Sequence, residues 1–302
     1  MGSIFKELCD KKLMGSHPPF IDGSVQYEVI MGSVAYGVSD DTSDMDVYGF
    51  CIPPKDYIFP HLRGEIKGFG TKGPTFDQFQ QHHIIDKDSL GGKGREYDVT
   101  IYSIIKFFNL CMENNPNMID SLFVPRRCIL YTTKVGEILR ENRYHFLHKG
   151  AWHKFKGYAF SQVHKMKTKK PIGKRKEIIK QYGFDVKFAY HVVRLLNEVE
   201  QILTEKDLDL ERNREQLKAI RRGEWSLQEI DDYFARKEKD LESLYTSSTL
   251  PYKPDELKIK EILLHCLEEH YGSLKGAIKD ENEPIKALRD IDNILKRVSD
   301  LY

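Results

Sequence analysis

Cysteine is scarce in this chain of 302 residues, and no two cysteines are spaced as Cys-x-x-Cys. The thiols are Cys9, Cys51, Cys111, Cys128 and Cys266. Thiols scattered in this way indicate neither a zinc site nor a disulfide framework. No cysteine has an arrangement with histidine that suggests a covalent nucleophile. We therefore expect a protein of the reducing cytosol.

Long apolar runs and an excess of one charge are also lacking. No stretch of about 18 apolar residues could span a membrane, and the N-terminus has no apolar run of the signal-peptide type. A soluble, cytoplasmic protein without a membrane partner is expected. The 47 basic and 46 acidic residues leave a net charge of +1. This balance excludes a wholly basic nucleic-acid coat protein, but it is compatible with a local basic patch.

A small-residue turn and a pair of alternating carboxylates are the most informative residues present. Gly32 lets a phosphate chain approach the backbone closely, and Ser33 offers a hydroxyl and an N–H to a phosphate oxygen. Asp44 and Asp46 would point to the same face of a strand, so both can bind the same pair of divalent cations. Strands are predicted on either side, over residues 25–31 and 47–52. The pattern predicts a site for a metal-bound nucleoside triphosphate.

The sequence around these residues resembles the signature of the DNA polymerase β nucleotidyltransferase superfamily. The matching strings are Gly32-Ser33-Val34-Ala35-Tyr36-Gly37, Ser43-Asp44-Met45-Asp46-Val47, Tyr97-Asp98-Val99-Thr100, the segment from Lys106-Phe107-Phe108 to Asn115-Pro116-Asn117, and Tyr182-Gly183-Phe184-Asp185 with His191 and Arg194. Within the superfamily, the chain looks most like the branch of predicted nucleotidyltransferases associated with RNA repair. The resemblance covers residues 25–230.

This resemblance implies an enzyme that transfers a nucleoside monophosphate from NTP to an acceptor hydroxyl and releases pyrophosphate, with an RNA end as the acceptor. The implied cofactors are two Mg²⁺ ions, or Mn²⁺ in their place. Two rival hypotheses stay open. The acceptor is a protein side chain or a small molecule, or the chain is a non-catalytic nucleotide or RNA sensor. Both Asp44 and Asp46 are retained, which argues against the sensor.

A third carboxylate is needed, because two-metal phosphoryl transfer requires a ligand that also holds or deprotonates the attacking hydroxyl. Asp98 is the candidate, since it opens an apolar strand over residues 99–102. That strand ends at Ser103, a predicted N-cap for a helix over residues 104–113. The resemblance places the third carboxylate on such a strand. Glu96 is the rival, two residues back on the same face.

The character of the sequence changes about midway. Strand-like segments and glycine-rich connections come first, and a helical period follows. We predict an α+β fold, with a polymerase-β-type catalytic domain and its mixed sheet over residues 1–148. A mostly helical domain over residues 149–302 would form the acceptor and nucleotide side of the cleft. The stretch over residues 60–95 is too glycine-rich for regular structure throughout, so it is either a lid or a surface excursion. Its His82 and His83 are given no role.

A helix is predicted over residues 185–203, and its cationic side chains form a stripe beside the apolar face. Lys187, His191 and Arg194 are spaced four and three apart, which places them along one edge. Such a stripe can grip a triphosphate, and the resemblance favours this role. The alternative is a surface ladder in which Glu198 pairs with Arg194.

A basic segment opens the helical half: residues 149–176 hold ten lysines and arginines and no acid. Aromatic residues interleave with the cations over residues 152–160, where burial is favoured over base stacking. Lys169, Lys170 and Lys174 belong to a predicted basic loop. Because basic side chains neutralise phosphates, this loop is the candidate RNA contact.

Overall fold

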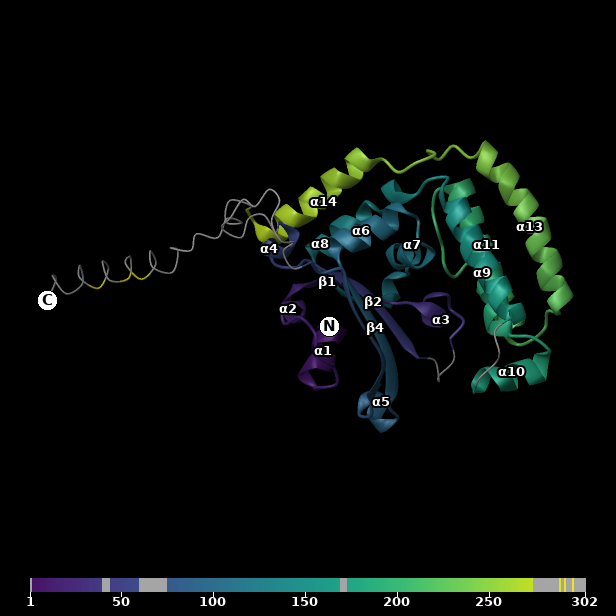
Figure 1. The fold of residues 1–302 in the computed structure, drawn as a ribbon, viewed down its shortest axis with the longest axis horizontal. Coiled ribbons are helices and arrows are strands. Elements are labelled where there is room, and N and C mark those ends of the chain that lie inside the picture. Colours follow the sequence, from purple (N-terminus) through teal and green to yellow (C-terminus); the bar gives the residue numbers. More distant parts are fainter. Residues whose placement is uncertain are drawn as a thin grey trace.

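The computed structural model describes residues 2–39, 44–59, 75–168 and 173–273, with the single positions 288, 291 and 295. A mixed sheet of five strands runs through the N-terminal half of the described chain (Figure 1). The strands are β1 (Val25–Ile30), β2 (Met45–Cys51), β3 (Gln78–Asp86), β4 (Arg95–Ser103) and β5 (Ile129–Thr132), in the order β3-β4-β2-β1-β5. Only β2 and β4 pair in parallel; the other neighbours are antiparallel. The predicted α+β class with a mixed sheet is confirmed.

Helices surround the sheet and make up the other elements of the described residues (Figure 1). Those of the N-terminal half are α1 (Ile4–Asp10), α2 (Ile21–Ser24), α3 (Gly32–Ala35), α4 (Lys55–Ile58), α5 (Ser89–Gly92), α6 (Ile104–Met112), α7 (Pro116–Phe123), α8 (Lys134–Glu141) and the 3₁₀ turns η2 (Arg126–Cys128) and η3 (Arg143–Phe146). Those that follow are α9 (Ala151–Thr168), α10 (Lys174–Tyr182), α11 (Val186–Glu205), α12 (Arg214–Arg221), α13 (Leu227–Ser247) and α14 (Glu256–Tyr271). None of the described helices is long and apolar enough to cross a bilayer.

The core is continuous between the two halves of the chain. Buried apolar side chains form one cluster that extends from Phe5 on α1 to Leu267 on α14. Helix α14 returns to the N-terminal half, where Lys134 of α8 pairs with Glu269 at 2.7 Å and the Tyr271 hydroxyl donates to the Pro53 carbonyl. The division into domains at residues 148 and 149 stays a prediction.

Strand β3 occupies part of the stretch described from the sequence as glycine-rich. Residues 60–74 lie outside the described residues, but Gln78–Asp86 pair antiparallel with β4. No glycine lies between residues 75 and 90, and the apolar side chains there favour a strand. More of this stretch is therefore regular than its glycine content indicates, and its strand forms one edge of the sheet.

The N-terminal segment is fastened to the sheet by a buried acid. Glu28, in the middle of the fully buried strand β1, accepts hydrogen bonds from the Ser3 hydroxyl at 3.0 Å and from the N–H groups of Ile4 and Phe5 at 2.7 and 3.0 Å. Those N–H groups open α1, whose first turn has no backbone acceptors of its own. The carboxylate thus docks the start of α1 on β1.

Candidate functional site

The turn after β1 lies directly against the carboxylate of Asp46. Gly32 begins α3 with a φ of +65°, and a Cβ at this position would lie 2.2 Å from Asp46 Oδ2. The Met31 N–H also donates to the Asp46 carbonyl oxygen at 2.7 Å. Ser33 follows on α3 with a half-buried side chain. Because only glycine leaves room for the carboxylate here, the turn and Asp46 form a single unit.

The acids come together because β2 and β4 run in parallel. Asp46 and Asp98 are direct partners across these strands, so their side chains leave the sheet on the same side. Asp44 lies exposed just before β2, two residues from Asp46. Burial raises the pKa of Asp46, and the negative charges of Asp98 and Asp44 raise it further. Crowded carboxylates of this kind are hard oxygen ligands that a divalent cation would neutralise.

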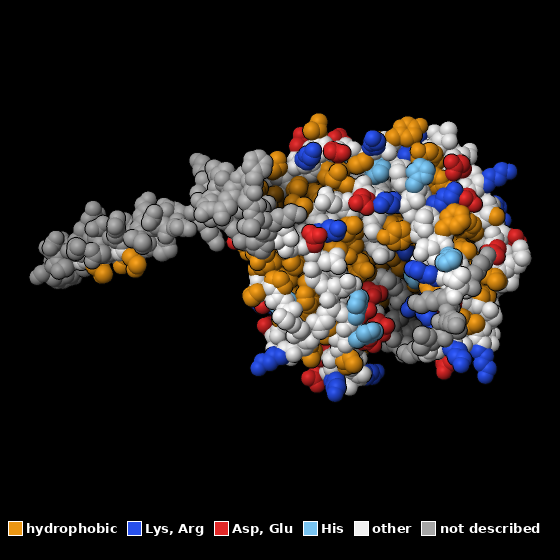
Figure 2. All heavy atoms as spheres, viewed as in Figure 1, with side chains coloured by type: hydrophobic (Ala, Val, Ile, Leu, Met, Phe, Trp, Pro, Cys, Tyr) orange, Lys and Arg blue, Asp and Glu red, His pale blue; other side chains and the backbone are white. Residues whose placement is uncertain are grey.

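His82 and His83 contact this acidic group, although the sequence indicated no role for them. The His83 N–H donates to Asp98 Oδ1 at 2.8 Å, and His82 Nδ1 lies 3.2 Å from Asp98 Oδ2. The His83 ring contacts the Glu96 carboxylate. Figure 2 shows histidine and acidic side chains side by side at the edge of a hollow in the surface. Both histidines sit where the pairing of β3 with β4 is irregular, between Gln81 and Ile84.

The register of β4 favours Asp98 over Glu96 as the partner of Asp46. Glu96 lies one step outside the pairing with β2, which begins at Met45 and Tyr97. His83, Glu96 and Asp98 nevertheless bring ligand atoms within 4.8 Å of one another and could also hold a cation. Two adjacent histidines are visible in the sequence, but the sequence alone does not place them near the acids. The irregular pairing of β3 with β4 directs them toward β4.

Helix α11 directs one cation toward the acids. Asp185 caps the helix by accepting from the N–H groups of Lys187 and Phe188. The exposed Lys187 lowers the pKa of Asp46 through its charge. Burial and the neighbouring cations, with Arg194 first among them, hold the pKa of His191 well below its usual range. His191 is therefore neutral, and the stripe predicted to be cationic carries no charge at this position.

Arg194 is held inside a buried network. Its guanidinium pairs with Asp120 of α7 and with Glu198 at 2.8 Å, and it lies 4.3 Å from the centre of the Tyr36 ring. The Tyr36 hydroxyl donates to Asp120 at 2.8 Å. The alternative pairing of Arg194 with Glu198 is thus present. Since Tyr36 directly follows α3, Arg194 supports the glycine turn through this contact.

The predicted RNA contact is described only in part. Lys169 and Lys170 lie outside the described residues, and Lys174 is the first residue of α10. The aromatic side chains over residues 152–160 were expected to be buried, and this holds for only some of them. Trp152 and Phe155 are fully buried, whereas Phe160 is 46% exposed.

A glycine turn placed against carboxylates on two parallel strands, in an α+β fold, is the arrangement expected of a nucleotidyltransferase of the polymerase β type. The chain belongs to the RNA repair pathway DNA polymerase β family, whose model matches residues 20–253. None of the curated proteins matches it. Among solved structures, it is similar to a nucleotidyltransferase-like protein from Exiguobacterium sibiricum 255-15, with 10% identity over 87% of this chain and 78% of that chain, and a TM-score of 0.28.

Proposed function

We propose that this protein transfers a nucleoside monophosphate from a nucleoside triphosphate to the hydroxyl of an RNA end and releases pyrophosphate. One observation carries the proposal. Asp46 is the register partner of Asp98, and its carboxylate lies against Gly32, 2.2 Å from where a Cβ at that position would stand. The acids proposed to bind metal and the turn proposed to bind phosphate therefore meet at one point.

The residues fit divalent cations, because burial and then the negative charges of Asp98 and Asp44 raise the pKa of Asp46, and a bound cation would relieve this cost. Asp44, Asp46 and Asp98 would hold two Mg²⁺ or Mn²⁺ ions. When bound, such ions supply charge neutralisation and a lowered pKa for the acceptor hydroxyl.

The protein's own groups would position the triphosphate. The backbone of Gly32 and the hydroxyl and N–H of Ser33 would bind phosphate oxygens, and Lys187 would neutralise charge on the chain as it enters. Neutral His191 can offer a hydrogen bond but no charge. Arg194 would act through Tyr36 by holding the turn in place. The acceptor hydroxyl would attack the α-phosphorus in line and give up its proton to the carboxylate of Asp98, and the bond from that phosphorus to pyrophosphate would break.

The RNA acceptor is supported by the family and by the basic segment over residues 149–176. The test combines the purified protein with α-labelled NTPs, Mg²⁺ and pooled small RNA. We expect label on RNA, and we expect Asp44→Asn to abolish it with the unfolding temperature unchanged. The matched control is Asp232→Asn, which changes an exposed acid on α13 and should keep full transfer.

The other outcomes of this experiment would favour one of the rival hypotheses or overturn the assignment. Label that appears only on protein or on a small molecule would move the acceptor away from RNA. The absence of NTP turnover with either metal would leave a nucleotide or RNA sensor that retains the fold. Label on RNA that persists in Asp44→Asn would overturn the assignment of the acids.

A further inference from the structure

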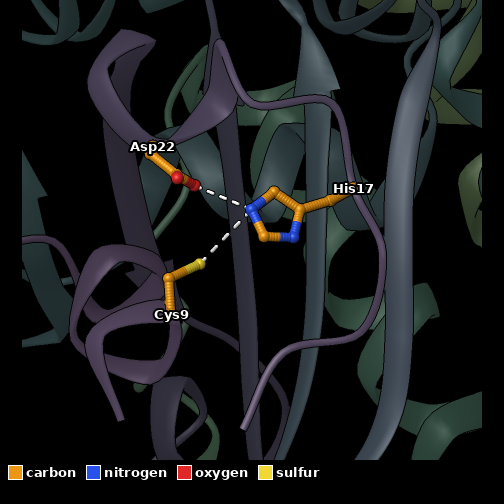
Figure 3. A group of neighbouring side chains, drawn as sticks. All are labelled: Cys9, His17 and Asp22. Carbon is orange, nitrogen blue, oxygen red and sulfur yellow. Dashed lines mark hydrogen bonds and ion pairs between the residues drawn. The ribbon is translucent and has the colours of Figure 1, made fainter. Parts of the chain in front are cut away.

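Three potential metal ligands from the segment before β1 lie together, although the cysteine spacing indicated no zinc site. Cys9 is in α1, Asp22 is in α2, and His17 is in the connection between them. His17 Nε2 lies 3.6 Å from Cys9 Sγ and 2.7 Å from Asp22 Oδ1. Figure 3 shows the thiol and the carboxylate directed at this same ring nitrogen. All three ligand atoms lie within 4.8 Å of one another.

The other ring nitrogen of His17 decides what Nε2 can do. Nδ1 lies 2.8 Å from the carbonyl oxygen of Gly15, which only accepts hydrogen bonds, so Nδ1 carries a proton. In the neutral ring, Nε2 then has a lone pair that faces an acceptor, the Asp22 carboxylate. A proton or a cation must lie between these two atoms. A histidine that donates from one nitrogen to a carbonyl while ligating through the other is the usual arrangement at metal sites.

We propose that Cys9, His17 and Asp22 bind one Zn²⁺ ion, independently of the proposed transfer reaction. Tetrahedral zinc, with Zn–S of about 2.3 Å and Zn–N of about 2.0–2.1 Å, separates sulfur and nitrogen by about 3.5 Å. The sulfur and nitrogen are 3.6 Å apart here. The Asp22 side chain is 47% exposed and can draw back from Nε2 to the longer separation that a shared ion requires. Water would fill the fourth position.

The ligand set separates this site from the acidic one. A thiolate and an imidazole select zinc over magnesium, whereas the three carboxylates near Gly32 favour a hard ion. Burial, followed by the charge of Asp22, raises the pKa of Cys9 to about 12. Because zinc binds the thiolate, zinc binding would release the thiol proton.

An ion here would clip α1 and α2 together against β3. The His17 ring lies 5.2 Å from Phe5 on α1 and 5.6 Å from Phe79 on β3. The Gly15 N–H donates to the side-chain oxygen of Gln81 at 2.7 Å. Gln81 immediately precedes the histidines that contact Asp98. The clip therefore braces the strand that delivers these histidines.

Cobalt can report on the site, because a thiolate bound to Co²⁺ gives a near-ultraviolet charge-transfer band that carboxylate ligands lack. Chelator-treated full-length protein is titrated with Co²⁺ in excess Mg²⁺, which occupies the acidic site. We expect a band with a one-equivalent endpoint that Zn²⁺ bleaches. Cys9→Ser should abolish the band, and Asp22→Asn should weaken Co²⁺ affinity about tenfold or more. The control Cys266→Ala removes a buried thiol elsewhere and should keep the band.

Zn²⁺ should also raise the unfolding temperature of the wild type and not that of Cys9→Ser, since a ligand stabilises the state that binds it. Asp22→Asn changes an exposed side chain and keeps the test informative if Cys9→Ser fails to fold. No thiolate band at stoichiometric Co²⁺, or a band that Cys9→Ser retains, would overturn the proposal. The group would then be a hydrogen-bonded contact between His17 and Asp22 without a metal.

Discussion

Gly32 and Asp46 fill a space that has no room for another side-chain atom. The carboxylate oxygen lies where a Cβ would stand, and the glycine backbone is left-handed. Both facts require glycine, one through contact and the other through conformation. The sequence motif therefore reflects packing between the turn and Asp46.

Gly32→Ala tests this contact. We expect a loss of about 1–2 kcal/mol in the free energy of unfolding from the left-handed backbone. We also expect transfer to fall about 100-fold because Asp46 must move. Denaturant unfolding and label transfer measure the two effects. Gly157→Ala, in open space on α9, should instead stabilise by about 0.5–1 kcal/mol. Wild-type transfer by Gly32→Ala would show that the close contact is not required.

Asp98 and Glu96 offer a direct comparison of two neighbouring acids. Only Asp98 pairs in register with Asp46, while Glu96 contacts the His83 ring. We expect Asp98→Asn to lower the rate of transfer by about 100-fold or more, since the substitution removes a proposed metal ligand. Glu96→Gln should keep most of the activity. Transfer rates measured over a range of Mg²⁺ concentrations provide the comparison, and equal losses would contradict the assignment of Asp98.

At the scale of elements, local sequence patterns predicted those strands and helices whose formation depends on a short segment alone. The strand over residues 25–31 corresponds to β1 (Val25–Ile30), and the helix over residues 104–113 to α6 (Ile104–Met112). Ser103 caps α6 by accepting from the Lys106 N–H, as its position before an apolar run predicted. Such caps need only three or four consecutive residues, so the sequence contains the whole interaction.

Contacts between elements could not be predicted from the sequence, because they depend on packing between distant segments. His82 and His83 reach Asp98 only through the irregular pairing of β3 with β4. The predicted stripe does lie on one helix, α11, but two of its three residues differ from the predicted free cations. Burial neutralises His191, and Asp120 from α7 occupies Arg194. Periodicity places a side chain on a face and does not identify what packs against that face.

The docking of α1 on β1 predicts a pH dependence of stability. Burial raises the pKa of Glu28 above its value in the unfolded chain. The stabilising contribution is therefore complete below the ordinary glutamate range and is lost as the pH rises through the raised pKa. The free energy of unfolding of the wild type relative to Glu28→Gln should fall across that window. Exposed Glu177→Gln should leave the profile unchanged. A difference that rises with pH would show that hydrogen bonds to α1 outweigh burial.

At the scale of the whole molecule, one buried network joins the helical half to the glycine turn at Gly32. Arg194 of α11 contacts Asp120 of α7, and Asp120 accepts from the hydroxyl of Tyr36 behind α3. Burial raises the pKa of both Asp120 and Glu198 around this single guanidinium. Removing Arg194 from its acidic partners would leave a buried charge unpaired, which is costly. The network therefore holds the two halves in one arrangement beside the turn where the triphosphate would bind.

The helical half also carries the basic segment over residues 149–176, and its charge predicts a salt dependence of RNA binding. Alanine at Lys169, Lys170 and Lys174 should weaken RNA binding and make its dependence on salt shallower. Because each phosphate contact on a single strand contributes about 0.7 to the slope of log affinity against log salt, three lost contacts would reduce it by about 2. Titrations of labelled RNA at several salt concentrations measure the slope. The matched triple replaces Lys253, Lys258 and Lys260, around the start of α14, and should leave the slope unchanged. If both triples weaken binding equally, the affinity reflects net charge, and Lys169, Lys170 and Lys174 are not the contact.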